Sequence, residues 1–435
     1  MKLAPFKPID NAPLILFRIF FGFLFACETF GAILTGWVKD NFLLPDFTFS
    51  HIGMEWLQPL PGYGMYFYFA AMGLLSLSVM VGYRYRLTLG MLTLLWSGAY
   101  FMQKTSYNNH YYLLMLVALI MLFLPANAYA SVDARQNPKL KSLVMPAWCS
   151  WVMIGQMAIV YCFATVAKFY PDWLNGTFTR HLFAGISDDP FVNNLFGQPW
   201  FYLFIAYAGI VFDGLIVPAL LWKKTRTIAL IASLIFHVFN SITLKIGIFP
   251  YFALSFAVFF YEPETIRNLF FKKWKPKPDG VVAVSSGKKI LLFFFVPYFA
   301  LQLALPLRHW FIKGDVLWTE EGHRLSWRMM LRDRDGVVAF KVVDKKTKET
   351  SFYPYRTFLT RKQADGMASK PDMIWQLAQR IKKDYAAKGK AVAVYVDCMA
   401  SVNRGPYKRL INPNVDLAAA DWNYFGHDSW VILYD

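Results

Sequence analysis

Long apolar runs recur through the first three quarters of the chain and constrain its fold more than any other feature. A helix that crosses a bilayer needs about 20 apolar residues, and shorter runs are tolerated inside a bundle. The sequence contains nine such runs, at 13–36, 62–82, 86–102, 110–126, 147–168, 198–222, 227–244, 248–261 and 289–306. The fourth and eighth are short enough to be re-entrant. The pattern predicts an α-helical polytopic membrane bundle of about nine segments.

The composition agrees with a membrane bundle. Hydrophobic residues make up 56% of the 435 residues and charged residues only 17%, whereas soluble globular domains carry about 25% charged residues. A chain built only of soluble domains is therefore excluded, and a disordered chain would be far less apolar. The four cysteines, Cys27, Cys149, Cys162 and Cys398, show no C-x-x-C pair and no zinc spacing. We therefore expect neither a disulfide framework nor a metal site.

The composition changes after Pro306, where most of the acidic residues are found. We expect two domains, a transmembrane helical domain at 1–306 and a soluble α+β domain at 307–435. Within the second, the alternation of apolar residues predicts a hairpin at 337–356 and strands at 391–402 and 429–434, the last of which would close the domain. Apolar residues at helical spacing from Met373 to Tyr385 predict one amphipathic helix.

The basic residues fall mostly in every second connection between the apolar runs. The formal net charge of +17 raises nucleic acid or an anionic membrane as a partner. One set of connections carries Lys2, Lys7, Arg84, Arg86, Arg135, Lys139, Lys141, Lys223, Lys224, Arg226, Arg267, Lys272, Lys273, Lys275, Lys277, Lys288 and Lys289. The alternate set carries Lys39, Lys104, Lys168, Arg180 and Lys245. Such alternation is typical of positive residues on the cytoplasmic side.

This topology predicts a multi-pass integral membrane protein in contact with lipid and not with nucleic acid. The N-terminus would be cytoplasmic and the C-terminal domain extracytoplasmic, either periplasmic at a bacterial inner membrane or lumenal in a eukaryote. The segment 104–110, KTSYNNH, would then lie at the outer ends of the third and fourth runs. Lys168 ends the fifth run on the same side, and His237 with Asn240 lies near the outer end of the seventh. Proton-transfer groups are thus expected to gather beneath the soluble domain.

Each of these groups also has a structural interpretation. Lys168 is either a lysine that snorkels from a helix end or a desolvated base with a lowered pKa. His110 could cap a helix, and His237 could serve an interhelical hydrogen bond. Asp213 and Glu28 lie at membrane depth, where ionisable groups occur with a partner or a function. The residues alone leave these alternatives open.

Seven stretches give the chain a resemblance to a known family. They are FRIFFGFL at 17–24, LQPLP at 57–61, KTSYNNHYYL at 104–113, GQMAIVYCFATVAKFYPDWLNG at 155–176, FHVFNSITLKIGIFPY at 236–251, WTEEGHRLSWRMM at 318–330 and INPNVD at 411–416. In these stretches, which run in order along nearly the whole chain, the sequence resembles the vitamin K-dependent γ-glutamyl carboxylases and their shorter bacterial relatives. Their membrane part is the horizontally transferred transmembrane (HTTM) domain.

The resemblance implies a membrane enzyme of the lyase class. Its family oxygenates reduced vitamin K, a naphthohydroquinone such as phylloquinol or menaquinol, with O2. The reaction generates a strong alkoxide base that removes a glutamate γ-proton, and the carbanion attacks CO2, leaving vitamin K epoxide. By resemblance, Lys168 is the base that deprotonates the hydroquinone. His110 matches the histidine that handles protons in the carboxylation step.

Further residues are assigned by the same resemblance. Five match the residues expected around the hydroquinone: Asn109, Tyr161, His237, Met329 and Met330. Five match the residues expected to hold a glutamate-containing peptide or protein: Trp318, Ser326, Trp327, Arg334 and Arg361. Around His323 and Arg332 the local sequence departs from the animal pattern, which affects substrate recognition more than the base.

Two other functions remain open from the sequence. One is a hydroquinone epoxidase or monooxygenase that does not carboxylate protein. The other is a non-catalytic membrane transporter or receptor, although transporters tend to carry inverted repeats around a midplane site and no repeat is visible here.

Overall fold

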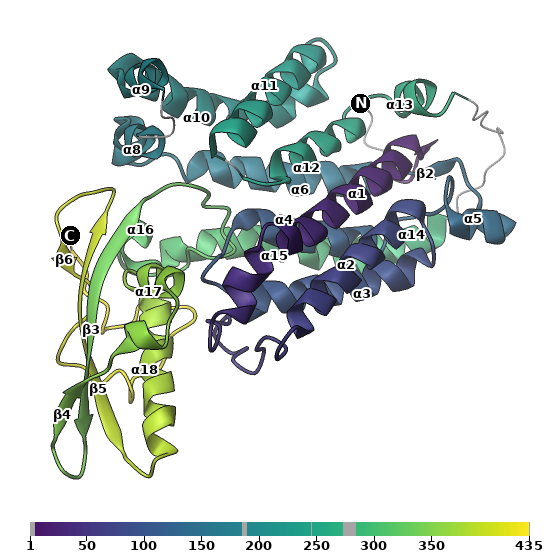
Figure 1. Ribbon diagram of the computed structural model, residues 1–435. Coiled ribbons are helices and arrows are strands. Elements are labelled where there is room, and N and C mark those ends of the chain that lie inside the picture. The colour runs from purple at the N-terminus through teal and green to yellow at the C-terminus, as the bar shows by residue number, and fades with distance from the viewer. Residues whose placement is uncertain (1–4, 185–188, 245, 273–283, 435) are drawn as a thin grey trace.

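The computed structural model describes residues 5–184, 189–244, 246–272 and 284–434. In Figure 1 a bundle of helices occupies one side of the molecule, and a small domain with a sheet and two helices stands against one end of it. The basic residues Lys2, Lys245, Lys273, Lys275 and Lys277 of the predicted charge pattern lie outside the described residues.

Six helices of the described part are long and apolar enough to cross a membrane. They are α1 (Ala12–Leu34), α2 (Gly64–Val81), α6 (Trp148–Val166), α10 (Pro199–Leu221), α11 (Arg226–Leu244) and the segment Gly287–Phe311, which includes the end of α14 (Val284–Ile290) and all of α15 (Val296–Leu307). The other three predicted runs form α3 (Tyr85–Met102), α4 (Asn109–Met121) and α12 (Phe249–Ser255) with the 3-10 turn Phe256–Phe259. These are shorter or more polar, so six spans are supported and the count of nine is not confirmed.

Short elements connect the long helices. They are β1 (Pro8–Asp10), which pairs with β2 (Val144–Pro146), and the helices α5 (Val132–Gln136), α7 (Pro171–Leu174), α8 (Thr177–Phe183), α9 (Pro190–Gly197) and α13 (Pro263–Phe270). The C-terminal region adds α16 (Val316–Thr319), α17 (Arg361–Met367), α18 (Pro371–Ala386), β3 (Arg334–Asp344), β4 (Thr350–Phe352), β5 (Val392–Val402) and β6 (Lys408–Arg409).

The first helix lies at the centre of the bundle. Phe17, Phe21 and Phe25 repeat at four-residue spacing and are fully buried on one stripe of α1. Phe17 packs edge-on against Phe256 with the ring centroids 4.7 Å apart, a geometry that aromatic pairs favour. On another face Gly22 lets α2 approach closely, because a Cβ there would lie 2.5 Å from the backbone nitrogen of Met80. The apolar stripe thus packs against α12 and the turn that follows it, and the contact at Gly22 packs α2 against α1.

The C-terminal domain is an antiparallel sheet covered on one face by α18. Its strand order is β4-β3-β5-β6, and Val338 pairs with Cys398 at the middle of the long β3–β5 ladder. The apolar stripe of α18, including Ile374 and Ile381, is buried against this sheet. The predicted hairpin, the amphipathic helix and the strand at 391–402 are thereby confirmed.

The predicted closing strand at 429–434 is wrong. The segment forms only a single bridge, between Ile411 and Val431. The outer edge of β5 is occupied by β6. The amide of Val431 donates to the carbonyl of Asp428 at 2.9 Å, which is a local turn. The segment is apolar although it is not a strand, because Trp430 and Val431 are buried in the core of the C-terminal domain.

The bundle contributes one residue to the core of the C-terminal domain. Phe49, which follows α1 in the chain, is buried among the residues of that core. Its carbonyl accepts the amide of Lys104 at 2.7 Å, and the carbonyl of the neighbouring Ser50 accepts Nε2 of Gln376 at 3.0 Å. The two parts are therefore joined through the loops that carry the site.

Candidate active site

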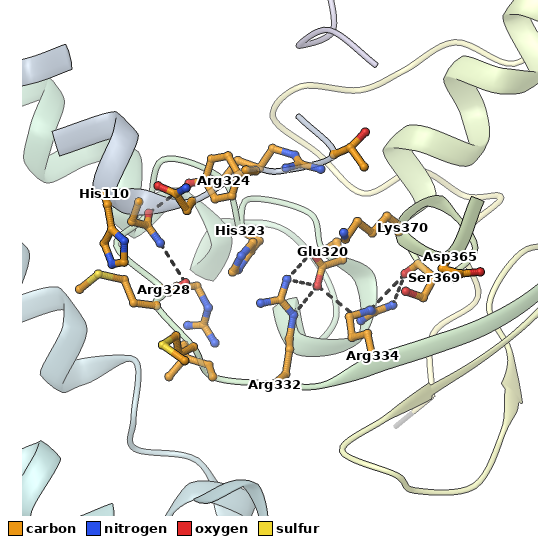
Figure 2. A pocket seen from close by; sticks show the side chains of 18 residues that line it. His110, Glu320, His323, Arg324, Arg328, Arg332, Arg334, Asp365, Ser369 and Lys370 are labelled. Atoms are coloured by element: carbon orange, nitrogen blue, oxygen red, sulfur yellow. Dashed lines mark hydrogen bonds and ion pairs between the residues drawn. The ribbon is translucent and has the colours of Figure 1, made fainter. Parts of the chain in front are cut away.

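A polar cavity of about 310 Å³ lies at this junction. Figure 2 shows its lining, which comes from three segments that are distant in sequence. These are the start of α4 at 108–110, the loop 320–334 and the end of α17 with the turn 366–370. Asn108 fixes the first segment, because its side chain accepts the amide of Tyr111 at 2.8 Å and caps α4. The cap places His110 in the first turn, at the edge of the cavity.

The loop 320–334 holds an unusual backbone. Four non-glycine residues have positive φ angles, namely Glu320 at 63°, Leu325 at 61°, Trp327 at 55° and Met330 at 48°. Such conformations are uncommon and are kept only where surrounding contacts hold them. Here the amide of Leu325 donates to Oη of Tyr107 at 2.7 Å, and Trp327 is fully buried. A loop under this constraint is typical of a functional site.

Most charges around the cavity are paired. Glu320 binds Arg332, and Nη1 of Arg334 lies 3.5 Å from the same carboxylate. Asp372 accepts from Nζ of Lys104 at 2.8 Å and from Nη2 of Arg324 at 3.0 Å. Burial alone would raise the pKa of both carboxyls, but the adjacent cations reverse this and hold each pKa well below its usual range. Both carboxylates are therefore ionised, and each is shared by two cations.

Two cations are left without a carboxylate partner among the described residues. Burial lowers the pKa of Arg328 only to about 10, so this residue stays charged at neutral pH. Its nearest polar side-chain neighbour is Nε2 of His309 at 3.4 Å. Burial, together with Arg324, lowers the pKa of Lys370 to about 8, and its ammonium has no hydrogen bond within the described chain. Figure 2 shows both facing the same cavity, which can therefore receive a carboxylate.

A second, larger cavity of about 650 Å³ opens on the other side of His110. Its walls come mainly from apolar residues of α1, α4 and α12, with Glu28 as an acidic side chain among them. The ring of His110 stacks on Phe249 with the centroids 3.8 Å apart and the planes at 14°. His110, Asn108 and Met330 line both cavities. His110 thus stands in the wall between a cationic cavity and an apolar one.

Two family models match the chain. Residues 6–264 match the HTTM domain, and residues 287–435 match the lumenal domain of vitamin K-dependent gamma-carboxylase. The chain belongs to the vitamin K-dependent γ-carboxylase family. No solved structure matches it. Membership gives it a vitamin K-dependent carboxylase-like function in a multi-pass membrane protein, and implies reduced vitamin K, O2, CO2 and a glutamate-containing substrate.

Of the five residues that resemblance assigns to the hydroquinone, three line the polar cavity, Met330 also lines the apolar one, and two line neither. Asn109, Met329 and Met330 line the polar cavity, and Nδ2 of Asn109 also donates to the carbonyl of Arg328 at 3.2 Å. Tyr161 and His237 form a pair, with Oη and Nε2 at 3.2 Å. The centroid of the His237 ring lies 6.2 Å from the ring centroid of Phe249, which lines the apolar cavity.

Lys168 is separated from His110 in the structure. It follows the end of α6 and is buried, with Nζ 2.5 Å from Oδ2 of Asp213 and 3.1 Å from the carbonyl of Ala164. It lies over the ring of Trp173 at 5.2 Å and lines neither cavity that His110 lines. The structural interpretation of Asp213 as half of an ion pair is therefore confirmed, and the catalytic role of Lys168 stays a prediction.

The residues assigned to the peptide substrate are dispersed. Arg334 lines the polar cavity, while Trp318 lies behind it and donates through Nε1 to the carbonyl of Ile432 at 2.7 Å. Ser326 lines a neighbouring cavity of about 430 Å³ that it shares with Arg328, and Trp327 is buried in the bundle core. The side chain of Arg361 is 95% exposed and pairs with Asp365.

Several residues of the site were not singled out from the sequence. They are Glu320, Arg324, Arg328, Lys370 and Asp372. A usable signal was present in the four arginines between 324 and 334, which is a dense cluster for an α+β domain surface. No sequence pattern shows which of these arginines meets a carboxylate, because one carboxylate, Glu320, is shared by two of them and the other, Asp372, comes from α18.

Asp372→Asn is expected to destabilise the junction of the two domains by about 3–5 kcal/mol, because it leaves Lys104 and Arg324 buried without a counter-charge. Thermal unfolding of the purified chain in detergent measures the effect. Asp384→Asn is the matched control, since Asp384 lies on the same helix and its side chain is 38% exposed. Equal unfolding midpoints for the two variants would show that the buried cluster does not hold the domains together.

Proposed function

We propose that the protein oxygenates reduced vitamin K to its epoxide and couples this reaction to γ-carboxylation of glutamate residues with CO2. One observation carries the proposal, namely the position of His110 in the wall between the two cavities. An apolar cavity of about 650 Å³ is within the usual size range of ligand pockets and suits a flat naphthohydroquinone. A cationic cavity next to it suits a glutamate side chain.

The apolar cavity fits the hydroquinone in shape and in chemistry. The stacked rings of His110 and Phe249 provide a flat wall, and Glu28 and Tyr111 add polar groups to an otherwise apolar lining. Reduced vitamin K, when bound, supplies on oxygenation a base strong enough to remove a γ-proton, which no side chain can do at pH 7. Such a base has to be kept from water, which would otherwise quench it, and a cavity between apolar helices suits this requirement.

The two unpaired cations match the charge of substrate and product. Glutamate enters with one γ-carboxylate, and carboxylation places a second carboxylate on the same carbon. Arg328 and Lys370 face the polar cavity without carboxylate partners, so each can bind one of these groups. Nδ2 of Asn109 donates to the backbone carbonyl of Arg328, and this hydrogen bond fixes the loop beside His110. His110 is placed to hand a proton between the two cavities.

The deciding experiment uses the purified full-length chain in detergent with vitamin K hydroquinone, O2, labelled bicarbonate and a glutamate-containing peptide. Epoxide and peptide-bound label are measured in the same reaction, and both are expected. Epoxide without label would overturn the coupling and leave an epoxidase. Neither product, from a protein with a normal unfolding transition, would overturn the proposed function.

His110→Ala is expected to uncouple the two products. The carboxylate fixed per epoxide should fall at least about tenfold, because general acid–base groups contribute about 10²–10⁴-fold to the steps they serve. Epoxide formation should fall much less. His181→Ala is the control, since His181 lies on α8 and lines neither cavity. A parallel loss of both products in His110→Ala would contradict a role specific to carboxylation.

Lys370 gives the carboxylation a pH dependence. Its pKa of about 8 means that the ammonium is charged below this pH and neutral above it. The apparent KM for the peptide should therefore rise as the pH passes from 7 through about 8, while epoxide formation changes little. Lys370→Arg keeps the charge and should remove this rise. Burial also lowers the pKa of Lys104 to about 8, so a rise that persists in Lys370→Arg would assign the effect to Lys104 instead.

A further inference from the structure

A third cavity, of about 570 Å³, lies at the opposite end of the bundle from the active site. It is formed by the start of α1, the end of α2 and the connection 129–141, which includes α5. Figure 1 shows α5 beside the end of the bundle that is remote from the sheet. Three of its lining residues are cations, namely Arg18, Arg135 and Lys141, and no acidic residue lines it.

Arg18 lies at the floor of this cavity and is fully buried. Its guanidinium donates to backbone carbonyls beyond the end of α4, to Ala126 at 2.9 Å and to Ala130 at 2.6 Å. Its Nε has no hydrogen-bond partner among the described residues. The guanidinium therefore has neutral acceptors but no counter-charge, and burial of an uncompensated charge is costly.

The nearest acidic residue is already occupied. The two carboxylate oxygens of Asp133 accept the amides of Arg84 and Tyr85 at 2.7 and 2.9 Å, and Nδ2 of Asn127 donates to it at 2.8 Å. Arg135 and Lys141 form no ion pair with any residue that the structure describes. Three cations thus surround one cavity with no carboxylate directed at them.

Most of the rest of the lining is apolar. Ile19, Met80 and Val81 line the cavity, and Val81 is 43% exposed. Because α1 begins at Ala12 and α2 ends at Val81, the cavity lies within two turns of the ends of two spanning helices. A ligand held here would have its anionic group against the cations and an apolar part along the helices.

We propose that this cavity binds the headgroup of an anionic glycerophospholipid. The phosphodiester would lie between the exposed side chains of Arg135 and Lys141, with the buried guanidinium of Arg18 beneath it as a further positive charge, and the acyl chains would follow α2 past Val81. Basic pockets between helices at a membrane surface recognise lipid phosphates in this manner. A free phosphate would satisfy the cations but would leave the apolar part of the cavity unfilled.

The test compares phosphatidylglycerol, phosphatidylcholine and inorganic phosphate, each added to the full chain in a neutral detergent. Bound lipid is counted by native mass spectrometry and the unfolding midpoint is recorded. Phosphatidylglycerol is expected to bind and to raise the midpoint, whereas the other two are not. Arg135→Gln/Lys141→Gln should weaken phosphatidylglycerol binding at least about tenfold, since each basic residue near a lipid surface adds about a fewfold to the affinity.

The matched control is Lys7→Gln/Lys139→Gln, which removes two exposed cations from neighbouring segments that do not line the cavity. Its affinity for phosphatidylglycerol should stay within about twofold of the parent chain. Both Arg135 and Lys141 are exposed, so their replacement leaves the packing of Arg18 intact. Equal losses in the two double variants, equal binding of phosphatidylcholine, or stabilisation by phosphate alone would each overturn the proposal.

Discussion

Lys168→Met is expected to lower epoxide formation and carboxylation together, by about 10³-fold, because a base that starts the reaction serves both products. The structure makes this a demanding expectation, since Lys168 lines neither cavity that meets His110 and is bound to Asp213 at 2.5 Å. A lysine acts as a base only when it is neutral. The ion pair with Asp213 is therefore the contact that has to be separated from a catalytic role of Lys168.

The loss must be separated from a loss of folding. Lys168→Met alone leaves the carboxylate of Asp213 buried without a partner, which costs about 3–5 kcal/mol. The double variant Lys168→Met/Asp213→Leu removes both charges, and replacement of a buried ion pair by apolar residues is often neutral. It should recover the unfolding midpoint but neither product. Recovery of epoxide formation in the double variant would show that Lys168 is only a structural partner of Asp213.

The parts of the fold that were predicted correctly depend on local patterns. An apolar run of membrane length forms a helix, and a stripe such as that from Met373 to Tyr385 forms a helix that packs its apolar face against the sheet. The failures depend on partners that are distant in sequence. The run 429–434 has strand composition, but the outer edge of β5 is occupied by β6, and the run forms only one bridge. The count of nine spans is not confirmed, because α3 is not among the six helices that are long and apolar enough, and α4 and α12 are short.

The site shows the same division. The segment 104–110 was placed at the site because its polarity exceeds what a turn requires, and His110 does line both cavities. Arg361 was assigned by resemblance, yet its side chain is 95% exposed, because the helix that carries it turns this position outward. Arg328 was not singled out, since its lack of a carboxylate partner is visible only after the partners of its neighbours are known.

Arg328→Met is expected to lower kcat/KM for the glutamate-containing peptide by about 100-fold while epoxide formation stays within about twofold. Removing a charged partner from a desolvated carboxylate costs about 2–5 kcal/mol, which corresponds to this loss. The effect should be confined to carboxylation, because Arg328 lines the cationic cavity and not the apolar one. Peptide-bound label and epoxide, measured over a range of peptide concentrations, separate the two.

Arg409→Met is the control for Arg328→Met, since Arg409 is exposed on β6 and pairs with Asp397 at the sheet surface. Arg328→Lys should restore part of the affinity, because it returns the charge without the two-pronged geometry of a guanidinium. If the peptide KM of Arg328→Met equals that of the control, the carboxylate is bound elsewhere. Lys370 and Arg334 would then be the remaining candidates, although the guanidinium of Arg334 is already occupied by the carbonyls of Ser369 and Trp318 at 2.6 and 2.9 Å. A substrate carboxylate would have to displace these bonds, which is why the unpaired Arg328 is the stronger expectation.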